Sequence, residues 1–342
     1  MKRKLLEFIR RATGMPLLAA EIAAARAEIA ALHAGISERH TGLSASVSAD
    51  SKTKPELEIL EAAPYARYAL PIEYPPSRDL RPRWGATRPP IAKLAEWMGR
   101  QDNDYRAVLA AMRARAPQLA RINRDFDAAL LPEPAWCGVP YAAFDSAALY
   151  TLIGEYQPNL YLEIGSGITT TFAHRAIQDH GLSTRIVSID PEPRAAIDSI
   201  CDEVIRTGLE TCDLSVFDAL EAGDILFLDG SHRVFMNSDV TVFMIDVLPR
   251  VKPGVLVHVH DIQLPWDYPD MFINWYWSEA YILAAYFLGG LDRVKPILPT
   301  TWVCRSPQFD DWFNEQPIVN LGPQNDAWRG GGAMWFTHTR PV

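Results

Sequence analysis

Short apolar runs alternate with amphipathic stretches over the second half of the chain. Apolar runs at 160–164, 185–189, 225–228 and 255–259 have the length of buried strands. Helical spacing marks 145–156, 169–178, 193–200 and 235–248, and Asp145 or Ser146 stands where a helix N-cap is expected. This alternation predicts a doubly wound α/β fold with a mostly parallel sheet and right-handed crossovers.

The first 41 residues have a different pattern, which predicts an amphipathic or coiled-coil helix. Basic and apolar residues mix over 2–11, which fits either peripheral contact with an anionic membrane or a solvated helix start. Further on, apolar residues are spaced alternately by three and four. This spacing is typical of a short coiled coil that forms a homo-oligomer, and equally of an amphipathic helix lying on its own domain. These residues are Met15, Leu18, Ile22, Ala25, Ile29, Leu32 and Ile36.

Two segments separate this helix from the alternating core. Residues 42–63 have few large apolar side chains and are rich in Ser, Thr, Ala and Lys at their start, so we predict a flexible linker. Residues 64–90 are rich in Pro, Tyr and Arg, as in an extended arm, and 91–130 regain helical spacing that predicts two or three helices. Residues 64–143 are therefore expected to form an arm and a helical cap, and 144–342 the main domain.

Composition narrows the class of protein. The chain has 342 residues, of which 48% are hydrophobic and 22% charged, with a mean hydropathy of −0.07. Its net charge of −9 argues against a nucleic-acid partner, because binding phosphates needs a surplus of Lys and Arg. No apolar run approaches the roughly 20 residues of a membrane span. We expect a soluble or membrane-peripheral protein.

The cysteines and the N-terminus indicate the compartment. The four cysteines form no CxxC pair, so neither a zinc site nor a disulfide framework is predicted. The apolar run after the basic start is broken by Glu7, Arg10 and Arg11, which is unlike a signal peptide. These features favour the reducing cytoplasm. The cysteines are Cys137, Cys201, Cys212 and Cys304.

A glycine turn follows the first predicted strand. Gly165, Ser166 and Gly167 lead into a helix, and glycines at this turn let a ligand approach the backbone closely. Glu163, just before the turn, offers a carboxylate to a cationic amino group. By itself the turn predicts only a nucleotide-like ligand, because residues 168–170 leave the dinucleotide fingerprint incomplete.

Polar residues also follow the other three strands. Asp190 ends the second strand, where a carboxylate can hold ribose hydroxyls. Asp-Gly-Ser-His at 229–232 follows the third, and His-Asp at 260–261 follows the fourth. With Glu-x-Gly-x-Gly at 163–167, these motifs resemble the class I S-adenosylmethionine-dependent methyltransferases, and among them a bacterial small-molecule and glycan group. The resemblance covers 144–339.

The resemblance implies a cofactor and roles for individual residues. It implies a seven-stranded, Rossmann-like sheet whose last two strands, within 292–303 and 332–338, form an antiparallel pair. It also implies that S-adenosylmethionine binds along the strand ends. The residues are Glu163, Gly165, Ser166 and Gly167 for its methionine part, Asp190 for the ribose, Glu210 near the adenine and Asp229 beside the sulfonium.

Histidines at the same edge suit methyl transfer to a hydroxyl. That reaction needs an aligned nucleophile and a group that takes its proton, so we expect His260 or His232 as the base, with Asp261 beside it. The alternative is structural: His232 would cap a helix beginning near Val234, and His260 would be a hydrogen-bonded strand-end residue. His258 is expected to be a satisfied core histidine.

A catalytic metal is not favoured. Asp229 and Asp261 match two of the three ligands of the catechol-type O-methyltransferases, but the third ligand there is an Asn and this chain has Ile262. His232 or His260 would have to substitute. If a divalent ion binds, Asp229 and Asp261 are its expected ligands.

These features together predict a methyltransferase that acts on an oxygen of a small molecule or glycan, such as a sugar hydroxyl of a bacterial glycan or a natural product. Aromatic residues at 265–269 and 275–277 fit either a lid that packs on the core or a surface that stacks on a sugar or a planar ring. If they do both, they would close over this acceptor together with Tyr65, Tyr68 and Tyr74 of the arm. Two alternatives remain open. One is a nicotinamide-dependent oxidoreductase, which shares the architecture of 165–190, and the other is a non-catalytic scaffold acting through its coiled coil.

Overall fold

The computed structural model describes residues 81–85, 88–193, 197–315, 318–322 and 328–341, all within the compact unit Pro76–Val342. The predicted helix of 1–41, the linker of 42–63 and residues 64–80 of the arm lie outside the described residues. In the described part, no helix is both long enough and apolar enough to cross a membrane.

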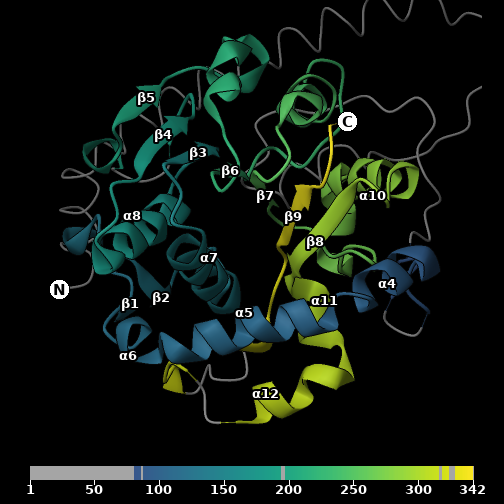
Figure 1. The fold of residues 1–342 in the computed structure, drawn as a ribbon, viewed down its shortest axis with the longest axis horizontal. Helices are drawn as coiled ribbons and strands as arrows, with labels where there is room; N and C mark the ends of the chain where they lie inside the picture. Colours follow the sequence, from purple (N-terminus) through teal and green to yellow (C-terminus); the bar gives the residue numbers. More distant parts are fainter. Residues whose placement is uncertain (1–80, 86–87, 194–196, 316–317, 323–327, 342) are drawn as a thin grey trace, which may run out of the picture. The chain divides into compact units, whose positions relative to one another are not determined.

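A seven-stranded sheet forms the centre of this unit (Figure 1). Its order is β5-β4-β3-β6-β7-β9-β8, and every neighbouring pair is parallel except those made by β9, which runs antiparallel to both β7 and β8. This confirms the predicted fold class and the closing antiparallel pair. The strands are β3 Leu160–Ile164, β4 Arg185–Ile189, β5 Glu203–Ile205, β6 Ile225–Leu228, β7 Leu256–Val259, β8 Val294–Pro299 and β9 Met334–His338.

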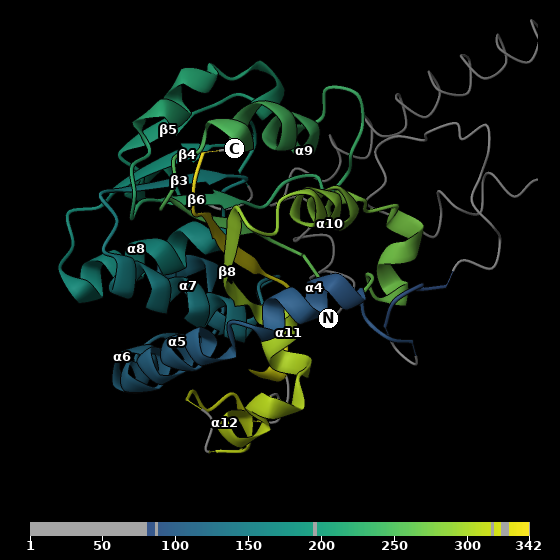
Figure 2. The same cartoon turned by 45° about the vertical axis from the view of Figure 1, so that its right-hand side comes forward.

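Helices cover both faces of the sheet (Figure 2). Side chains of α5, α7 and α8 pack against one face, together with Tyr161 and Phe227. Side chains of α4, α9 and α10 pack against the other, together with Leu162 and Leu226, because successive residues of a strand point to opposite faces. The helices are α4 Ala92–Gly99, α5 Asp102–Ala114, α6 Ala116–Leu119, α7 Ala143–Tyr156, α8 Ile168–His180, α9 Asp239–Val242, α10 Glu279–Gly289, α11 Thr300–Arg305 and α12 Asp310–Asn314.

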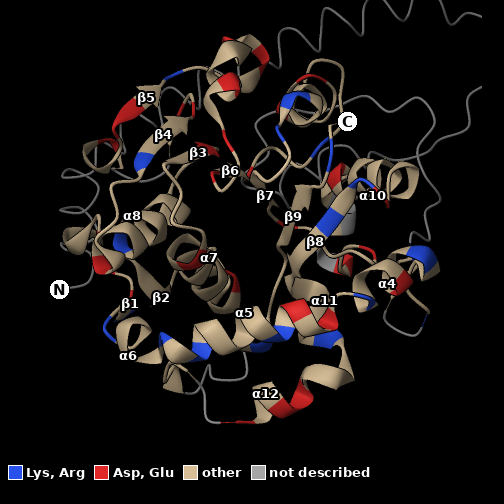
Figure 3. Cartoon of the chain, viewed as in Figure 1, with Lys and Arg blue, Asp and Glu red and all other residues tan. Residues whose placement is uncertain are grey.

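Smaller elements complete the fold. A two-stranded parallel sheet, β1 Asn123–Asp125 and β2 Ala135–Cys137, precedes α7. α9 continues as a π-helix, Phe243–Val247, and a 3-10 turn, Leu248–Arg250. Acidic and basic residues are both distributed over the helices around the sheet (Figure 3).

Several predicted boundaries are wrong. α7 begins at Ala143, so neither Asp145 nor Ser146 is its cap, and the Asp145 carboxylate instead accepts a hydrogen bond from the Gly332 N–H at 2.8 Å. The helix predicted at 235–248 begins at Asp239, because Ser238 accepts a hydrogen bond from the Thr241 N–H.

Other differences concern short or mixed segments. Of the helix predicted at 193–200, the described residues 197–200 contain only a 3-10 turn, Asp198–Ile200. The strand predicted within 292–303 ends at Pro299, and α11 follows. β5 was not predicted, because it has only three residues, of which Glu203 is exposed and Val204 and Ile205 are half-buried. The predicted boundary between 143 and 144 stays a prediction.

Candidate active site

The carboxyl ends of β3, β4, β6 and β7 meet along one edge of the sheet. Their order places Asp190, Gly165, Asp229 and His260 after neighbouring strands. Ligands of open parallel sheets bind just outside such strand ends. The fold therefore brings the predicted cofactor and acceptor residues to one place.

Gly165 packs against the backbone that follows β6. Its φ is +76°, and a Cβ atom added there would lie 1.8 Å from the carbonyl oxygen of Asp229, so only glycine fits. The Gly165 N–H donates to the Ile189 carbonyl at 3.0 Å, and the Asp229 N–H donates to the Ile164 carbonyl at 2.9 Å. A Cβ added at Gly167 meets nothing within 4 Å. The loop is fixed on its inner side and open at Gly167.

Glu163 lies on β3 just before this loop and is fully buried. Its carboxylate accepts hydrogen bonds from the hydroxyls of Thr169 and Thr170 in the first turn of α8, and from Tyr161 at 3.2 Å. Burial raises the pKa of Glu163 to about 8, although these hydrogen bonds act in the opposite direction. Both carboxylate oxygens are occupied within the protein, so the role of Glu163 toward a cationic amino group stays a prediction.

Asp190 is tied to the glycine loop. The Ser166 N–H donates to Asp190 Oδ2 at 2.9 Å, and the Glu192 N–H donates to Oδ1 at 2.7 Å. The Ser166 hydroxyl also lies 2.6 Å from the Ser188 hydroxyl. Beyond β5, Glu210 is exposed in a short 3-10 helix, Leu209–Thr211. The protein alone therefore fixes the Asp190 carboxylate beside the loop.

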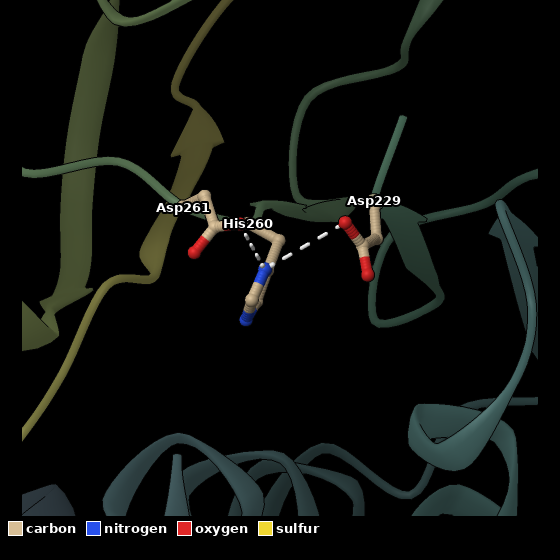
Figure 4. A group of neighbouring side chains, drawn as sticks. All are labelled: Asp229, His260 and Asp261. Atoms are coloured by element: carbon tan, nitrogen blue, oxygen red, sulfur yellow. Dashed lines mark ion pairs between the residues drawn. The ribbon is translucent and has the colours of Figure 1, made fainter. Parts of the chain in front are cut away.

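Asp229, His232, His260 and Asp261 form a cluster at the ends of β6 and β7, three of them drawn in Figure 4. His260 Nδ1 lies 3.7 Å from Asp229 Oδ1 and 3.5 Å from Asp261 Oδ2. His232 Nε2 lies 3.5 Å from each of the same two oxygens. Both histidines are buried, whereas the side chains of Asp229 and Asp261 are 34% and 27% exposed. Solvent reaches the cluster through its carboxylates.

For His260 and Asp261, the ion pairs of the cluster shift the pKa more than burial does. Burial acts to lower the pKa of His260, but the carboxylates of Asp261 and Asp229 raise it to about 10. For Asp261, burial acts to raise the pKa, and His260 holds it below its ordinary value. His260 and its two neighbours therefore carry compensating charges.

His232 is held by a buried carboxylate. Its Nδ1 lies 3.0 Å from Glu279 Oε2, and its backbone carbonyl accepts hydrogen bonds from the N–H groups of Ser278 and Glu279 at the start of α10. Burial acts to lower the pKa of His232, but Glu279 first and then Asp229 and Asp261 raise it above its ordinary value. His232 does not cap a helix near Val234, because the next helix is α9, which Ser238 caps.

Tyr141, just before α7, and Asp145, in the first turn of α7, line the same cluster. The Tyr141 ring lies 4.9 Å from the His260 ring, and its hydroxyl donates a long hydrogen bond of 3.4 Å to the Asp145 carbonyl. Burial raises the pKa of Tyr141 well above its ordinary value, and the carboxylates of Asp145, Asp229, Glu163 and Asp261 add to this. Asp145 is 1% exposed, and burial raises its pKa to about 6.

Residues 162–262, from β3 to just beyond β7, match a family model described as a methyltransferase domain. This segment contains the glycine loop, Asp190, Asp229, His232 and the His260-Asp261 pair. The match and the order of the strands agree with the predicted resemblance to class I S-adenosylmethionine-dependent methyltransferases over this segment.

Comparisons beyond this methyltransferase model are more distant. One similar solved structure is the O-methyltransferase TomG from Streptomyces achromogenes in complex with SAM, with 17% identity over 67% of this chain and 89% of that chain and a TM-score of 0.35. Another is the SAH-bound Podospora anserina methyltransferase PaMTH1, with 13% identity over 63% and 95% and a TM-score of 0.34. No curated protein matched the chain.

Two residues of the methyltransferase site were missed from the sequence. Asp145 is a lone carboxylate in a helix whose other residues from 143 to 154 are small, apolar or hydroxylated, and that contrast was the available signal. Glu279 directly follows the N-cap Ser278 of α10, where an acidic residue normally suggests only a favourable helix start. Each joins the cluster through a contact with a residue far away in the sequence.

His258 is a core residue, as predicted, but its ring is not satisfied by hydrogen bonds. It is fully buried in β7 and stacks on Phe227 at 3.8 Å, as a core residue does. Neither ring nitrogen has a hydrogen-bond partner among the described residues, so it is not a satisfied histidine. Burial lowers its pKa well below the ordinary value, which keeps the ring neutral.

The predicted aromatic loop lines a groove. The groove has a volume of about 580 Å³, and its lining includes Trp84, Trp266, Tyr268 and Arg305. The Arg305 guanidinium lies 5.3 Å from the centre of the Trp266 ring. Nearer the methyltransferase site, the Trp277 ring packs against the His232 ring, with ring centres 4.1 Å apart and the planes tilted by 38°. The predicted arm tyrosines, Tyr65, Tyr68 and Tyr74, lie outside the described residues.

Proposed function

We propose that this methyltransferase transfers the methyl group of S-adenosylmethionine to a hydroxyl oxygen of a small molecule or glycan, and that His232 takes the hydroxyl proton. The observation that carries the proposal is the His232–Glu279 pair: Glu279 holds Nδ1 of the ring, and Nε2 lies 3.5 Å from each of the two strand-end aspartates, Asp229 and Asp261. A sugar hydroxyl of a bacterial glycan or of a natural product is the proposed acceptor.

The residues of the cofactor side fit S-adenosylmethionine. Gly167 leaves open space beside the loop, and the Asp190 carboxylate stands next to it for ribose hydroxyls. Asp229 supplies negative charge near the sulfonium, while Ser166 and the exposed Glu210 border the same strand ends. When bound, the cofactor supplies a methyl group activated by the positive sulfur.

His232 suits the base role better than His260. A general base is most effective when its second nitrogen is held by an acceptor that fixes the tautomer and the ring orientation, and Glu279 does this for His232. Both histidines lie beside Asp229 and Asp261, and the pKa of each is raised, but only for His260 does it reach about 10, which keeps that ring protonated near neutral pH. We therefore assign His260 to binding and charge compensation, with Asp261.

A metal-assisted version of the same reaction is the second candidate. Asp229, His260 and Asp261 each offer a ligand atom, and these atoms lie within 4.8 Å of one another. Two carboxylates and one imidazole suit a divalent ion such as Mn²⁺, which would orient acceptor oxygens. We favour the metal-free version because the imidazole already compensates the two carboxylates. Turnover that is lost in a chelator and restored by a divalent ion would reverse this choice.

Other proposals concern the part of the chain before residue 81. We propose that residues 1–41 form a helix that pairs with a second copy or rests on a membrane surface, in a protein that acts in the cytoplasm. Removing residues 1–54 should then change oligomeric state or membrane binding and leave turnover on a soluble acceptor intact.

The alternative of a nicotinamide-dependent oxidoreductase finds no support in the family match. Equal binding of the nicotinamide cofactor and S-adenosylmethionine would revive it.

The test is a methyl-transfer screen with labelled cofactor against cell extracts and defined glycosides, using His232→Ala. Removing a general base is expected to lower kcat by about 10² to 10⁴-fold while the Kd for S-adenosylmethionine stays within about twofold. Glu279→Gln should give a smaller loss of the same kind, because the imidazole remains but is held less well. His174→Ala, on the surface of α8 away from the cluster, is the matched control. Unchanged kcat in His232→Ala would remove His232 as the base.

A further inference from the structure

Several buried side chains in and beside the cluster have polar atoms without a hydrogen-bond partner among the described residues, including Glu279 Oε1 and both ring nitrogens of His258. Three further atoms of this kind are Asp145 Oδ1, His260 Nε2 and Trp335 Nε1. The side chains are 1%, 5% and 0% exposed. Buried polar atoms are paired in more than about 90% of cases, so a group of unpaired ones indicates a place where a ligand supplies the partners.

These atoms belong to one wall of the site. Tyr141 links Asp145 to His260, because its ring lies 4.9 Å from the His260 ring and its hydroxyl bonds the Asp145 carbonyl. Gly332 links Asp145 to the residue after Asp261, because its N–H donates to Asp145 Oδ2 and its carbonyl accepts from the Ile262 N–H at 2.7 Å. Trp335 packs on His258 at 4.5 Å, and the His258 ring lies 5.8 Å from that of His260. The wall is therefore built by α7, β7 and β9, and we call Asp145, His260 and Trp335 the inner wall.

The inner wall lies on the acceptor side of the sheet. The glycine loop and Asp190 follow β3 and β4, whereas the inner wall involves β7 and β9, on the other side of β6. Asp145 also contacts the segment before β9, because its Oδ2 accepts the hydrogen bond of the Gly332 N–H at 2.8 Å. This bond anchors the side chain and leaves Oδ1 free for another donor.

The chemistry of the inner wall selects a class of ligand. Asp145 Oδ1 accepts a hydrogen bond, while the Trp335 indole and a protonated His260 donate one. Hydroxyl groups can both donate and accept, so neighbouring hydroxyls satisfy the whole set. A carboxylate or phosphate would face the negative charges of Asp145, Asp229 and Asp261, which disfavours an anionic acceptor.

We propose that Asp145 is an acceptor-binding residue: its Oδ1 accepts a hydrogen bond from a hydroxyl next to the one that is methylated, and the acceptor is a neutral polyhydroxylated molecule. This inference rests on the proposed function, whose acceptor it specifies. Tyr141 is the side chain that shifts to admit the acceptor, because its ring covers His260 and its hydroxyl has only the long hydrogen bond to Asp145.

The experiment compares wild-type protein with Asp145→Asn, using methyl hexopyranosides and their single-deoxy analogues as probes. Binding is measured by calorimetry with S-adenosylhomocysteine present, and methyl transfer is measured with labelled cofactor. Asp179→Asn is the matched control, because Asp179 pairs with Arg175 and Tyr150 at the far end of α8. Melting temperature and the Kd for S-adenosylmethionine report on structural damage.

The expected result is a loss of affinity that depends on one hydroxyl. Asp145→Asn should weaken binding of the preferred glycoside by about tenfold or more, the effect of losing a hydrogen bond to a charged group. The deoxy analogue that lacks the contacted hydroxyl should bind wild type and variant alike. The Kd for S-adenosylmethionine should stay within about twofold, and the Asp179→Asn control should behave as wild type.

Other results would overturn the inference. Asp145→Asn could weaken the binding of every glycoside equally or of none, or the wild type could bind no glycoside at all. An amino-sugar analogue that binds the wild type more strongly than the neutral glycoside would identify a cationic acceptor. The proposed function fails separately. If glycoside binding depends on Asp145 but no methyl transfer occurs, the role of Asp145 stands and the proposed reaction is refuted. If methyl transfer occurs and does not change in Asp145→Asn, the proposed reaction stands and the role of Asp145 is refuted.

Discussion

The two halves of the site differ in how completely their polar groups are paired. On the cofactor side, the Asp190 and Glu163 carboxylates and the Ser166 hydroxyl all have partners within the protein. On the acceptor side, Asp145 Oδ1, His260 Nε2 and Glu279 Oε1 are buried without a hydrogen bond among the described residues.

This difference separates two tasks of the enzyme. A cofactor site that is fully bonded in the free protein keeps its shape without a ligand, which lowers the cost of ordering it on binding. An acceptor site with unpaired polar atoms discriminates strongly, because a molecule that lacks the matching groups leaves them unpaired. Binding of S-adenosylmethionine should therefore depend on backbone shape, and the choice of acceptor on a few side chains.

The largest effect on the cofactor side is expected from Gly165→Ala. The added Cβ would collide with the Asp229 carbonyl and require a strained positive φ, so the strand end must move. We expect a lower melting temperature of the free protein and a Kd for S-adenosylmethionine raised by about 100-fold or more, equivalent to about 2.7 kcal/mol.

Gly167→Ala is the matched control. Its added Cβ meets no protein atom within 4 Å, so the melting temperature of the free protein should not change. Weaker cofactor binding in this variant alone would mean that the ligand occupies the open side of the loop. If Gly165→Ala melts and binds as wild type does, the cofactor side is not the fixed half of the site.

A smaller effect is expected from Asp190→Ala. The change removes the acceptor of the Ser166 and Glu192 N–H groups and the proposed partner of the ribose hydroxyls. We expect the Kd for S-adenosylmethionine to rise by about 10- to 100-fold, the effect of losing hydrogen bonds to a charged group, with kcat at saturating cofactor little changed. Asp190→Asn keeps an oxygen for Ser166 and should lose less. Unchanged binding in both variants would place the ribose elsewhere.

The cofactor side was easier to predict from the sequence than the acceptor side for a physical reason. Strands β3, β4 and β6 have the predicted bounds, because strands buried on both faces appear as continuous apolar runs. The residues after them must then lie at one edge of a parallel sheet. Local sequence alone therefore located Gly165, Asp190 and Asp229.

The acceptor side depends on contacts that no local pattern contains. Asp145 meets Gly332 across 187 positions, and Glu279 meets His232 across 47. Asp145 was interpreted as a helix cap because its spacing fits one equally well, and the tertiary contact decided its role. β5 was missed because a strand of three residues gives only a weak local signal. The late start of α9 was missed because a side-chain cap at Ser238 fixes it.

The smallest effect is expected from Glu163→Gln. The pH dependence of the stability of this variant tests whether the buried carboxyl group on the cofactor side is structural. Burial raises the pKa of Glu163 in the folded protein to about 8, above its ordinary value in the unfolded chain. The folded protein thus binds the proton more tightly, so the contribution of this group to stability is full below about pH 4.5 and is lost as pH rises through about 8. Glutamine does not titrate and escapes this loss.

The melting temperature of Glu163→Gln relative to wild type should therefore rise from pH 5 to about pH 8 and level off above that. At pH 5 the variant should be equal or less stable, because the amide cannot accept both threonine hydrogen bonds that the carboxyl group accepts. The exposed Glu210→Gln should show no such trend, since solvent screens its charge. A difference that is constant across this pH range would mean that Glu163 is ionised in the folded protein, and the pairing on the cofactor side would then be electrostatic rather than a network of neutral hydrogen bonds.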